Sequence, residues 1–570
     1  MVEKNKIAKK KRLVTAALPY INNVPHLGHI VGSHLPADIF ARYCRSCGYD
    51  TLFVGGTDEN GSASEIAAKS IGKEVKEFAT KLNEEHKKIY DWFGISYDNF
   101  SRTSNKIHSE TVIEFFKKLD KKGYINEKEI EAFYSPIDDM FLPDRYIEGT
   151  CPKCGYAKAN GDQCENCTTL LNPTELKNPI SKISGGKLEL KKTKHLYFSL
   201  DRLSPKLESW IQKQTIWRPQ VKNLAMGWIK EGLRERSITR DLKNGIRVPK
   251  EGYEDKVFYV WFDAPIGYIS STKEITDNWK AYWEGENTEI FNFLGKDNIP
   301  FHTIFWPAMI IGEEELNLPK NVIGLQYLNY EGKKFSKSKS VGVFCETLPN
   351  LDIDVDMWRS YLIQIIPESS DSEFNWEEFK TRVNSDLLGN YGNFVNRIIK
   401  FANTRLEGKI TRPDENKLDK VDKEVLNKIE EYKLRITESL EKGETRRAWS
   451  EVFALCSVGN KYIHENEPWK QITENPERVN NIYYIGTRLL KAISILSAPF
   501  IPTTAKKIWK QLGFEGSPLD LGSWDNITKD LSEEHKFGEN YLLFKKLDEK
   551  IIEESRITAS KASDLKSFFR

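Results

Sequence analysis

The run Arg12-Leu-Val-Thr-Ala-Ala-Leu-Pro-Tyr20 decides the fold, together with His26-Leu27-Gly28-His29, which follows after a short turn. The first run is apolar and has the length of a strand, which Pro19 stops. Apolar residues then recur at near-helical spacing until Gly48, and a second strand-like run, Asp50-Thr-Leu-Phe-Val-Gly55, comes next. Strand, helix and strand in this order predict a right-handed parallel unit, the start of a doubly wound α/β sheet.

Further along the chain the pattern changes three times. A Gly- and Lys-rich region first interrupts the alternation of strands and helices. Strand-like sequence resumes at Val257–Phe262 and Ile290–Gly295, and from about residue 380 the pattern is almost entirely helical. We therefore predict a split Rossmann-type catalytic domain with an insertion, followed by an all-α bundle. The expected parts are residues 1–120 (first half of the catalytic domain), 121–235 (insertion), 236–325 (second half), 326–385 (loop and stem-contact region) and 386–570 (helical domain).

Composition places few limits on partners. The 39% hydrophobic and 29% charged residues are typical of a globular protein. Because the net charge is only +2, any surface that binds nucleic acid must be a local basic patch. The basic residues before Arg12 form either a solvated tail or an arm that touches RNA. We expect no membrane span and no secretory signal, and eight Cys in 570 residues fit a reducing cytoplasm.

Two signatures suggest phosphate chemistry. Unpaired N–H groups at a helix start favour anions, Gly28 allows close backbone approach, and the imidazoles of His26 and His29 donate to phosphate oxygens. The second signature is Lys334-Phe335-Ser336-Lys337-Ser338, a basic loop that can close on pyrophosphate. Each has a plain alternative, since a histidine often simply caps a helix and a Lys/Ser loop is often only solvated.

Together the two signatures resemble the HIGH and KMSKS motifs of class I aminoacyl-tRNA synthetases, with Phe335 where the family has Met. Three further stretches are similar to methionyl-tRNA synthetases: Ala17–Tyr20, Tyr259–Tyr268 and Phe301–Pro307. Asn298 departs from that family, which usually has an apolar residue there. The resemblance covers nearly the whole chain and implies ATP-dependent activation of L-methionine, followed by its transfer to tRNA(Met).

The resemblance also implies the roles of particular residues. The methionine pocket would be lined by Ala17, Leu18, Tyr20, Asp58, Trp261, Ala264, Pro265, Tyr268, His302 and Trp306. A thioether suits such an aromatic slot, and Asp58 is the partner expected for the substrate ammonium. ATP, accompanied by Mg²⁺, would meet His26, Gly28, His29, Gly295, Asp297, Lys334, Ser336 and Lys337, with the two histidines and the two lysines catalytic. The alternative for Trp261 is an ordinary core strand.

A four-cysteine cluster predicts zinc in the insertion. Cys151-Pro-Lys-Cys154 and Cys164-Glu-Asn-Cys167 have the paired spacing of a tetrahedral four-thiolate site. Four thiolates leave no open position, so the metal would be structural. Cys44-Arg-Ser-Cys47 lacks a matching second pair, and Cys345 and Cys456, which stand alone, are expected to be buried.

The helical C-terminal region is the predicted RNA reader. Asn393 and Arg397 are four residues apart and share a helix face, while Trp469 offers a ring for stacking on an unpaired base. These three match the anticodon-binding positions of the family; the alternative is that Trp469 packs against Pro468. No part of the chain resembles the dimerising domain of some relatives, so a cytoplasmic monomer is expected.

Other functions remain as alternatives. A small-molecule nucleotidylyltransferase also uses a His-x-Gly-His helix start, but it explains neither the cysteines nor the helical region. A non-catalytic relative would be expected to lack His26, His29 or Lys337, which are all present. Sister synthetases for leucine, isoleucine or valine carry a larger insertion than residues 121–235, and a cysteine enzyme would show an open zinc site in its pocket.

Overall fold

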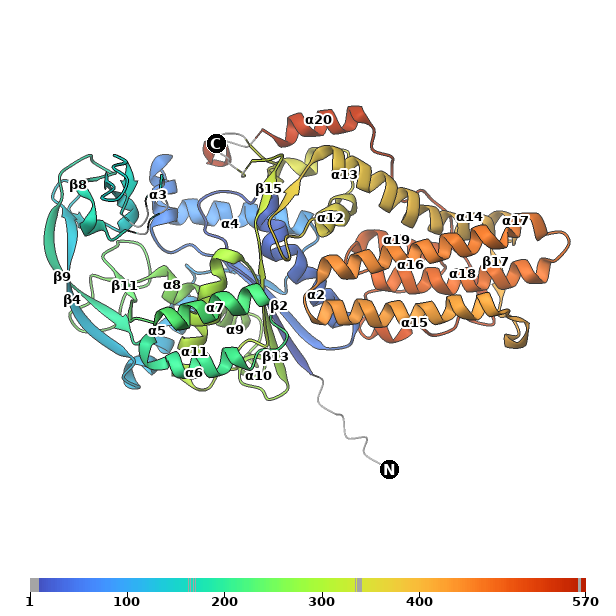
Figure 1. Cartoon of the computed structure of the whole chain (residues 1–570), viewed down its shortest axis with the longest axis horizontal. Helices are drawn as coiled ribbons and strands as arrows, with labels where there is room; N and C mark the ends of the chain where they lie inside the picture. Colours follow the sequence, from blue (N-terminus) through green and yellow to red (C-terminus); the bar gives the residue numbers. More distant parts are fainter. Residues whose placement is uncertain are drawn as a thin grey trace, which may run out of the picture.

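The computed structural model describes residues 10–161, 164, 166–167, 169, 171–333, 335, 341–561 and 565–569, apart from the side chains of residues 62, 63 and 145. Figure 1 shows an elongated molecule, with a sheet and its helices between an insertion at one end and a helical bundle at the other. None of the helices in the described part combines the length and apolarity that crossing a bilayer requires.

Five parallel strands form the central sheet, in the spatial order β14-β13-β1-β2-β3. Val14 in the central strand pairs with Phe53 on one side and Phe291 on the other, and all three are at most 2% exposed. Because β13 and β14 follow the insertion, the two halves of the chain share one sheet, which confirms the split doubly wound fold. The strands are β1 (Lys11–Ala16), β2 (Asp50–Thr57), β3 (Asn99–Arg102), β13 (Thr288–Gly295) and β14 (Asn321–Leu325).

Helices cover the sheet. The predicted first helix consists of α1 (Leu27–His29), a π-helical turn η1 (Ile30–His34) and α2 (Leu35–Ser46), and Gly48 ends it at a φ of 84°. A π turn inside a helix is frequent at functional sites. The other helices of this part are α3 (Ser62–Ser70), α4 (Val75–Trp92), α5 (Lys106–Lys121), α9 (Gly267–Lys273), α10 (Lys280–Trp283) and α11 (Trp306–Glu313).

The insertion is a long antiparallel hairpin with a small knuckle at its tip. β4 (Ile125–Ser135) pairs with β9 (Glu189–Phe198), in a sheet that also holds β5 (Met140–Phe141) and β10 (Arg236–Ser237). The knuckle has its own core and a three-stranded sheet of β6 (Ile147–Thr150), β7 (Ala159–Asn160) and β8 (Lys177–Ser181). Two helices, α6 (Leu200–Gln212) and α7 (Pro219–Glu231), lead back to the part that holds the central sheet.

The strand expected over Val257–Phe262 is mostly wrong. Only β12 (Val257–Phe258) is extended, paired with β11 (Thr239–Arg240), and the chain then turns into α8 (Val260–Asp263) and a 3₁₀ turn, η4 (Ala264–Ile266). A short apolar run has no clear period, so its sequence did not distinguish a strand from a buried helical turn. Pro265 stands in the first turn of η4, where its missing N–H costs nothing.

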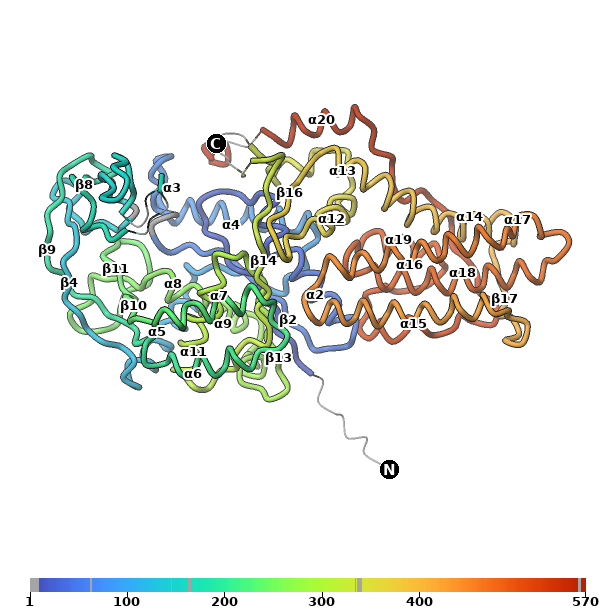
Figure 2. The backbone as a smooth tube through the Cα atoms, viewed as in Figure 1, coloured from blue at the N-terminus to red at the C-terminus, as the bar shows by residue number. Residues whose placement is uncertain are grey.

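A linking region connects the sheet to the bundle. β15 (Leu328–Tyr330) pairs with β16 (Ser372–Phe374), and α12 (Val355–Gln364), α13 (Trp376–Arg382) and the π-helix η9 (Val383–Gly392) lead into the bundle. The bundle comprises α14 (Asn393–Arg405), α15 (Lys420–Glu441), α16 (Thr445–Asn466), α17 (Pro468–Gln471), α18 (Pro476–Ser497) and α19 (Pro502–Gln511), with the short strands β17 (Lys409–Thr411) and β18 (Glu534–Lys536). Figure 2 shows the chain then returning beside α14 to α20 (Glu549–Ala559).

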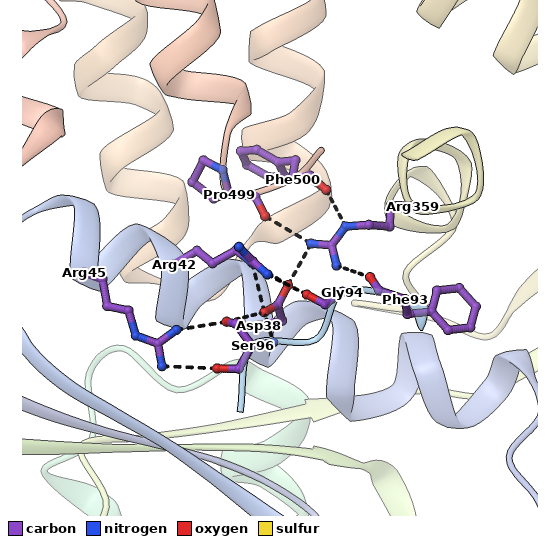
Figure 3. Close-up of polar contacts among 9 residues, drawn as sticks. All are labelled: Asp38, Arg42, Arg45, Phe93, Gly94, Ser96, Arg359, Pro499 and Phe500. Carbon is purple, nitrogen blue, oxygen red and sulfur yellow. Dashed lines mark hydrogen bonds and ion pairs between the residues drawn. The ribbon is translucent and has the colours of Figure 1, made fainter. Parts of the chain in front are cut away.

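A buried ion pair joins the three parts (Figure 3). Arg359 of α12 donates to Asp38 of α2 at 2.7 Å, and both side chains are fully buried. The same guanidinium donates to the carbonyls of Phe93, Pro499 and Phe500 at 2.8, 3.1 and 2.7 Å. One side chain therefore holds together the helix that follows His29, the linking region and the end of α18.

Candidate active site, zinc knuckle and RNA-binding face

The His-Leu-Gly-His turn is built by reciprocal capping. The His26 ring accepts from the N–H of Gly28 at 3.0 Å, and the His26 N–H lies 3.2 Å from Nδ1 of His29. A Cβ on Gly28 would come within 2.7 Å of the His26 ring, so glycine at this position lets the ring keep its capping contact. The two rings lie 4.1 Å apart between centroids, which places both imidazoles at one helix start.

Part of the second signature lies beside this turn. The Phe335 ring stacks on the His26 ring, with centroids 4.7 Å apart and planes 9° apart. Lys334, Ser336 and Lys337 lie outside the described residues, so their assignment to ATP stays a prediction. Phe335 thus lies beside the first signature, although the two residues are far apart in the sequence.

Aromatic side chains meet at the start of α8. Trp261 donates from Nε1 to the hydroxyl of Tyr20 at 3.0 Å, and its ring meets that of Phe301 edge-on at 4.0 Å between centroids. Trp261 is 37% exposed and Tyr20 43%, so neither has the burial of a core strand. Leu18 lies close to Gly267 of α9, where a Cβ would be 3.1 Å from its side chain.

A second group of predicted pocket residues is buried behind them. The Tyr268 hydroxyl lies 3.0 Å from Nε2 of His302, whose Nδ1 contacts the carbonyl of Asn298 at 3.0 Å. Burial lowers the pKa of His302 to about 4, so its ring is neutral at pH 7. This pair places one hydroxyl and one neutral imidazole in the buried interior, within reach of the charge of Asp58.

The remaining predicted pocket residues are placed differently. Ala264 and Pro265 form η4 directly after α8, and Ala17 follows the end of β1. Trp306 is 1% exposed, and its ring packs against Phe115 and Trp283 in the core. The described ring contacts of Trp306 are thus with core residues, and its assignment to the pocket stays a prediction.

Two buried carboxylates lie at the end of β2. Asp58 is 3% exposed, Asp263 is fully buried, and Asn60 donates to Asp263 at 2.6 Å. Within the described residues, one oxygen of each carboxylate lacks a hydrogen-bond partner. Burial raises the pKa of Asp263 to about 8, and burial followed by the charge of Asp263 raises that of Asp58 well above its ordinary value.

An ammonium group bound beside the pair would favour the ionised form of both carboxyls and would donate the hydrogen bonds that their two oxygens lack. From the sequence, Asp58 alone is assigned to the ammonium, and Asp263 has no role there. Its place in Trp-Phe-Asp-Ala-Pro is the signal, since a core strand does not explain a carboxylate at that position.

The predicted nucleotide residues Gly295 and Asp297 stand at the carboxyl end of β13. Gly295 is the last residue of the strand, and Asp297 lies in the turn η5 (Lys296–Asn298). Ligands of doubly wound sheets bind at this edge. Asp297 accepts a hydrogen bond from the hydroxyl of Tyr327, a residue that sequence reasoning did not single out.

The four cysteines of the knuckle converge on one point. All four sulfur atoms lie within 4.8 Å of one another, with Cys151 and Cys167 at 3.8 Å and Cys154 and Cys164 at 3.6 Å. Zn–S bonds of about 2.3 Å in a tetrahedron require S···S edges of about 3.8 Å. The donor set therefore fits one tetrahedral metal ion, and among the described residues it is the one cysteine-containing cluster with metal-ligand geometry.

The other cysteines have different surroundings. Cys44 receives a contact from Arg12 at 3.4 Å, and burial raises the pKa of Cys44 and of Cys47 to about 12. Both are therefore neutral thiols at pH 7 and unsuited to binding a metal. Cys345 and Cys456 are buried, as predicted.

The three predicted RNA contacts lie on the bundle. Asn393 donates to the side chain of Asn460 at 3.2 Å, and Arg397 donates to its carbonyl at 3.3 Å, so both share the α16-facing side of α14. Trp469 lies in α17 and is 45% exposed, which leaves its ring accessible for stacking. α17 sits at the far end of the bundle in Figure 1.

Comparisons with known proteins agree with this architecture. The family model for class I tRNA synthetases (M) matches residues 12–399, and the one for the anticodon binding domain of methionyl tRNA ligase matches residues 412–561. The solved structure of Mycobacterium tuberculosis methionyl-tRNA synthetase in complex with methionyl-adenylate has the same fold, with a TM-score of 0.78 at 23% identity, over 94% of this chain and 99% of that one.

Curated relatives are similar over most of their length. The methionine–tRNA ligase of Treponema denticola is 43% identical, over 96% of this chain and 72% of its own length. Methionine–tRNA ligase 1 of Acaryochloris marina is 45% identical, over 88% of this chain and 90% of its own length. The cytoplasmic enzyme of Saccharomyces cerevisiae is 40% identical over 95% and 73%. The fold and these matches define a class I aminoacyl-tRNA synthetase. Within that class, the chain belongs to the methionyl-tRNA synthetase family, whose members are methionine–tRNA ligases.

Proposed function

We propose that this chain activates L-methionine with ATP and transfers it to the 3′ end of tRNA(Met), with each residue group in a defined role. The observation that carries the proposal is the placement of three features beyond the carboxyl ends of β1 and β2: the His26–His29 helix start and Tyr20 follow β1, Asp58 follows β2, and a bridge joins Tyr20 to Asp58. Trp261 contacts Tyr20 and Asp263 contacts Asn60, which brings the aromatic slot and the second acid to the same place. The helix start suits a triphosphate, the acid pair an ammonium group and the aromatic slot an apolar side chain.

In the first step the methionine carboxylate attacks the α-phosphate of ATP, and pyrophosphate leaves. Asp58 and Asp263 hold the ammonium, while Trp261, Tyr268 and His302 surround the thioether. His26 and His29 donate to the phosphates, and Lys334 and Lys337 balance the charge that develops on the leaving group. No protein nucleophile is needed, so catalysis is positioning plus electrostatic stabilisation.

Metal ions have separate roles. Mg²⁺ bound with ATP would neutralise part of the phosphate charge. Cys151, Cys154, Cys164 and Cys167 would hold one zinc ion that folds the knuckle and takes no part in the reaction. Asn393, Arg397 and Trp469 would contact the anticodon. We further propose that the enzyme is a monomer, since all of these groups lie in one chain, and that it is cytoplasmic, since its eight cysteines are free thiols, as in a reducing compartment.

Amino-acid-dependent ATP–pyrophosphate exchange with all twenty amino acids tests the proposal. Exchange is expected with methionine alone and is expected to be lost in Lys337→Ala but retained in Lys320→Ala, an exposed lysine before β14. Exchange with another amino acid would contradict the pocket assignment, and absence of exchange with every amino acid would contradict the reaction. Light scattering on the purified chain tests the monomer.

A further inference from the structure

A cavity of about 720 Å³ lies between the start of the bundle and the chain that returns to α20. One wall comes from η9 and α14, and the other from residues 540–546, which Figure 2 shows running alongside α14. Its lining includes Asn393, one of the three predicted anticodon contacts, so the cavity borders the predicted RNA contacts at the start of α14.

The cavity is held open by fixed contacts. Asn384 exchanges two hydrogen bonds with the backbone of Leu547, at 2.7 and 3.0 Å, and Gln511 donates to the carbonyl of Tyr541 at 3.2 Å. The Tyr541 hydroxyl donates to the carbonyl of Lys507 at 3.0 Å. The returning segment is therefore anchored at both of its ends, and the space beneath it belongs to the folded state.

The groups around this space include polar side chains without partners. In the described part of the chain, the side-chain amides of Asn396 and Asn540 make no hydrogen bond. Within the same residues, the ammonium groups of Lys400 and Lys546 make no ion pair. All four side chains are exposed. Gln511 lines the same cavity and is fully buried, yet its Oε1 has no partner among the described residues. Buried amide oxygens are normally hydrogen-bonded, so this one indicates a missing donor.

An aromatic and apolar rim completes the cavity. Tyr541 is 41% exposed and Leu542 80% exposed, although both stand on a segment whose backbone is fixed. Proteins bind an unstacked nucleotide with three elements: a ring for the base face, amides for the base edge and cations for the phosphate. Here Tyr541 supplies the ring, and Lys400 and Lys546 supply the cations. The amides come from Asn396, Asn540 and Gln511.

We propose that this cavity binds one unstacked ribonucleotide of the bound tRNA, together with its phosphate. The proposal rests on the proposed function only in taking tRNA as the RNA that lies along α14. It adds a nucleotide site, formed by Asn396, Lys400, Gln511 and residues 540–546, to the contacts expected of Asn393, Arg397 and Trp469.

The test compares variants of the full-length protein for their affinity for tRNA(Met). Tyr541→Ala is expected to weaken binding about tenfold through lost stacking, whereas Tyr541→Phe keeps the ring and should bind like wild type. Lys400→Ala should weaken binding about threefold and reduce the slope of log K against log salt by about 0.7, the value for one single-strand phosphate. Lys423→Ala on α15, away from the cavity, is the matched control and should change neither.

Two further measurements separate the outcomes. Methionine-dependent ATP–pyrophosphate exchange should be unchanged in every cavity variant, because no residue of the proposed active site is altered. Wild-type affinity for tRNA in Tyr541→Ala and Lys400→Ala would overturn the nucleotide site while leaving the proposed function intact. Binding of free cytidine monophosphate that depends on Tyr541, with tRNA affinity unchanged, would also overturn it, since the cavity would then serve free nucleotides.

Discussion

The ring of Phe335 lies parallel to the ring of His26, with 4.7 Å between centroids and 9° between planes. Because His26 caps α1 through the N–H of Gly28, this contact fixes the loop residue against the helix start that we assign to phosphate binding. Gly342 allows the contact: its φ is 144°, and a Cβ there would come within 2.5 Å of the Phe335 ring.

Removing the Phe335 ring should therefore slow activation without unfolding the chain. A stacked aromatic pair contributes about 0.5–1.5 kcal/mol, so Phe335→Ala is expected to lower kcat/KM for ATP in pyrophosphate exchange by about two- to tenfold. Phe335→Met should retain most activity because it keeps an apolar contact on the ring. Equal activity of Phe335→Ala and wild type would show that the stack does not matter for catalysis.

The buried acid pair predicts an unusual dependence of stability on pH. The folded chain holds a proton on Asp263 up to a pKa of about 8, against an ordinary value of 3.8. Between these values the folded state binds more protons than the unfolded state, so this group lowers the free energy of unfolding as pH rises. Asp263→Asn removes the effect and should raise Tm at pH 8 relative to wild type, with no gain near pH 4.

The matched control is Asp277→Asn, an exposed carboxylate in a turn before α10, which should leave Tm unchanged at both pH values. Thermal unfolding followed by circular dichroism gives the comparison. A lower Tm for Asp263→Asn at pH 8 would mean that Asp263 gains more from its hydrogen bond with Asn60 than it loses by burial.

The same pair predicts how methionine binding depends on pH. Only the ionised carboxylates attract the substrate ammonium, so the KM for methionine in exchange should fall as pH rises from 6 towards 8. In Asp263→Asn the KM should be higher at pH 8 and should change less with pH. A KM for methionine that is constant from pH 6 to 8 would contradict the role of the pair.

The knuckle should depend on its metal ion. Purified protein is expected to contain one zinc per chain, and Cys154→Ser should release it, since three thiolates remain. Loss of zinc should expose residues 147–181 to limited proteolysis, while Cys47→Ser, the control, should keep both the zinc and the resistance. Full zinc content in Cys154→Ser would contradict the four-thiolate site.

Much of the fold was predictable because local signals agreed. Pro19, the His-Leu-Gly-His turn and Gly48 marked the limits of the first strand and helix, and the paired CxxC spacing pointed to the knuckle. The order of the strands was not predictable, since it depends on which edges pair after the insertion. The same limit applies to Asp263 beside Asp58 and to Phe335 on His26, where residues far apart in the sequence meet only in the folded chain.

The buried ion pair of Asp38 and Arg359 joins α2, which packs on the sheet, to α12 of the linking region. Burial alone would raise the pKa of Asp38, but the charges of Arg42 and Arg359 outweigh it and lower that pKa. Arg359→Met leaves Asp38 with only Arg42 and Ser96 as partners and frees the carbonyls of Phe93, Pro499 and Phe500.

Breaking a buried ion pair from one side costs about 3–5 kcal/mol, and urea unfolding of Arg359→Met should show a loss of this size. The double variant Asp38→Asn with Arg359→Met should lose less than the sum of the two single changes, because it removes both members of the Asp38–Arg359 pair and leaves neither of them buried without the other. Since Arg359 also fixes the end of α18, we expect the bundle to unfold separately from the sheet in Arg359→Met, seen as two transitions. A single transition with strictly additive losses would mean that the pair is not what couples the bundle to the helix that follows His29.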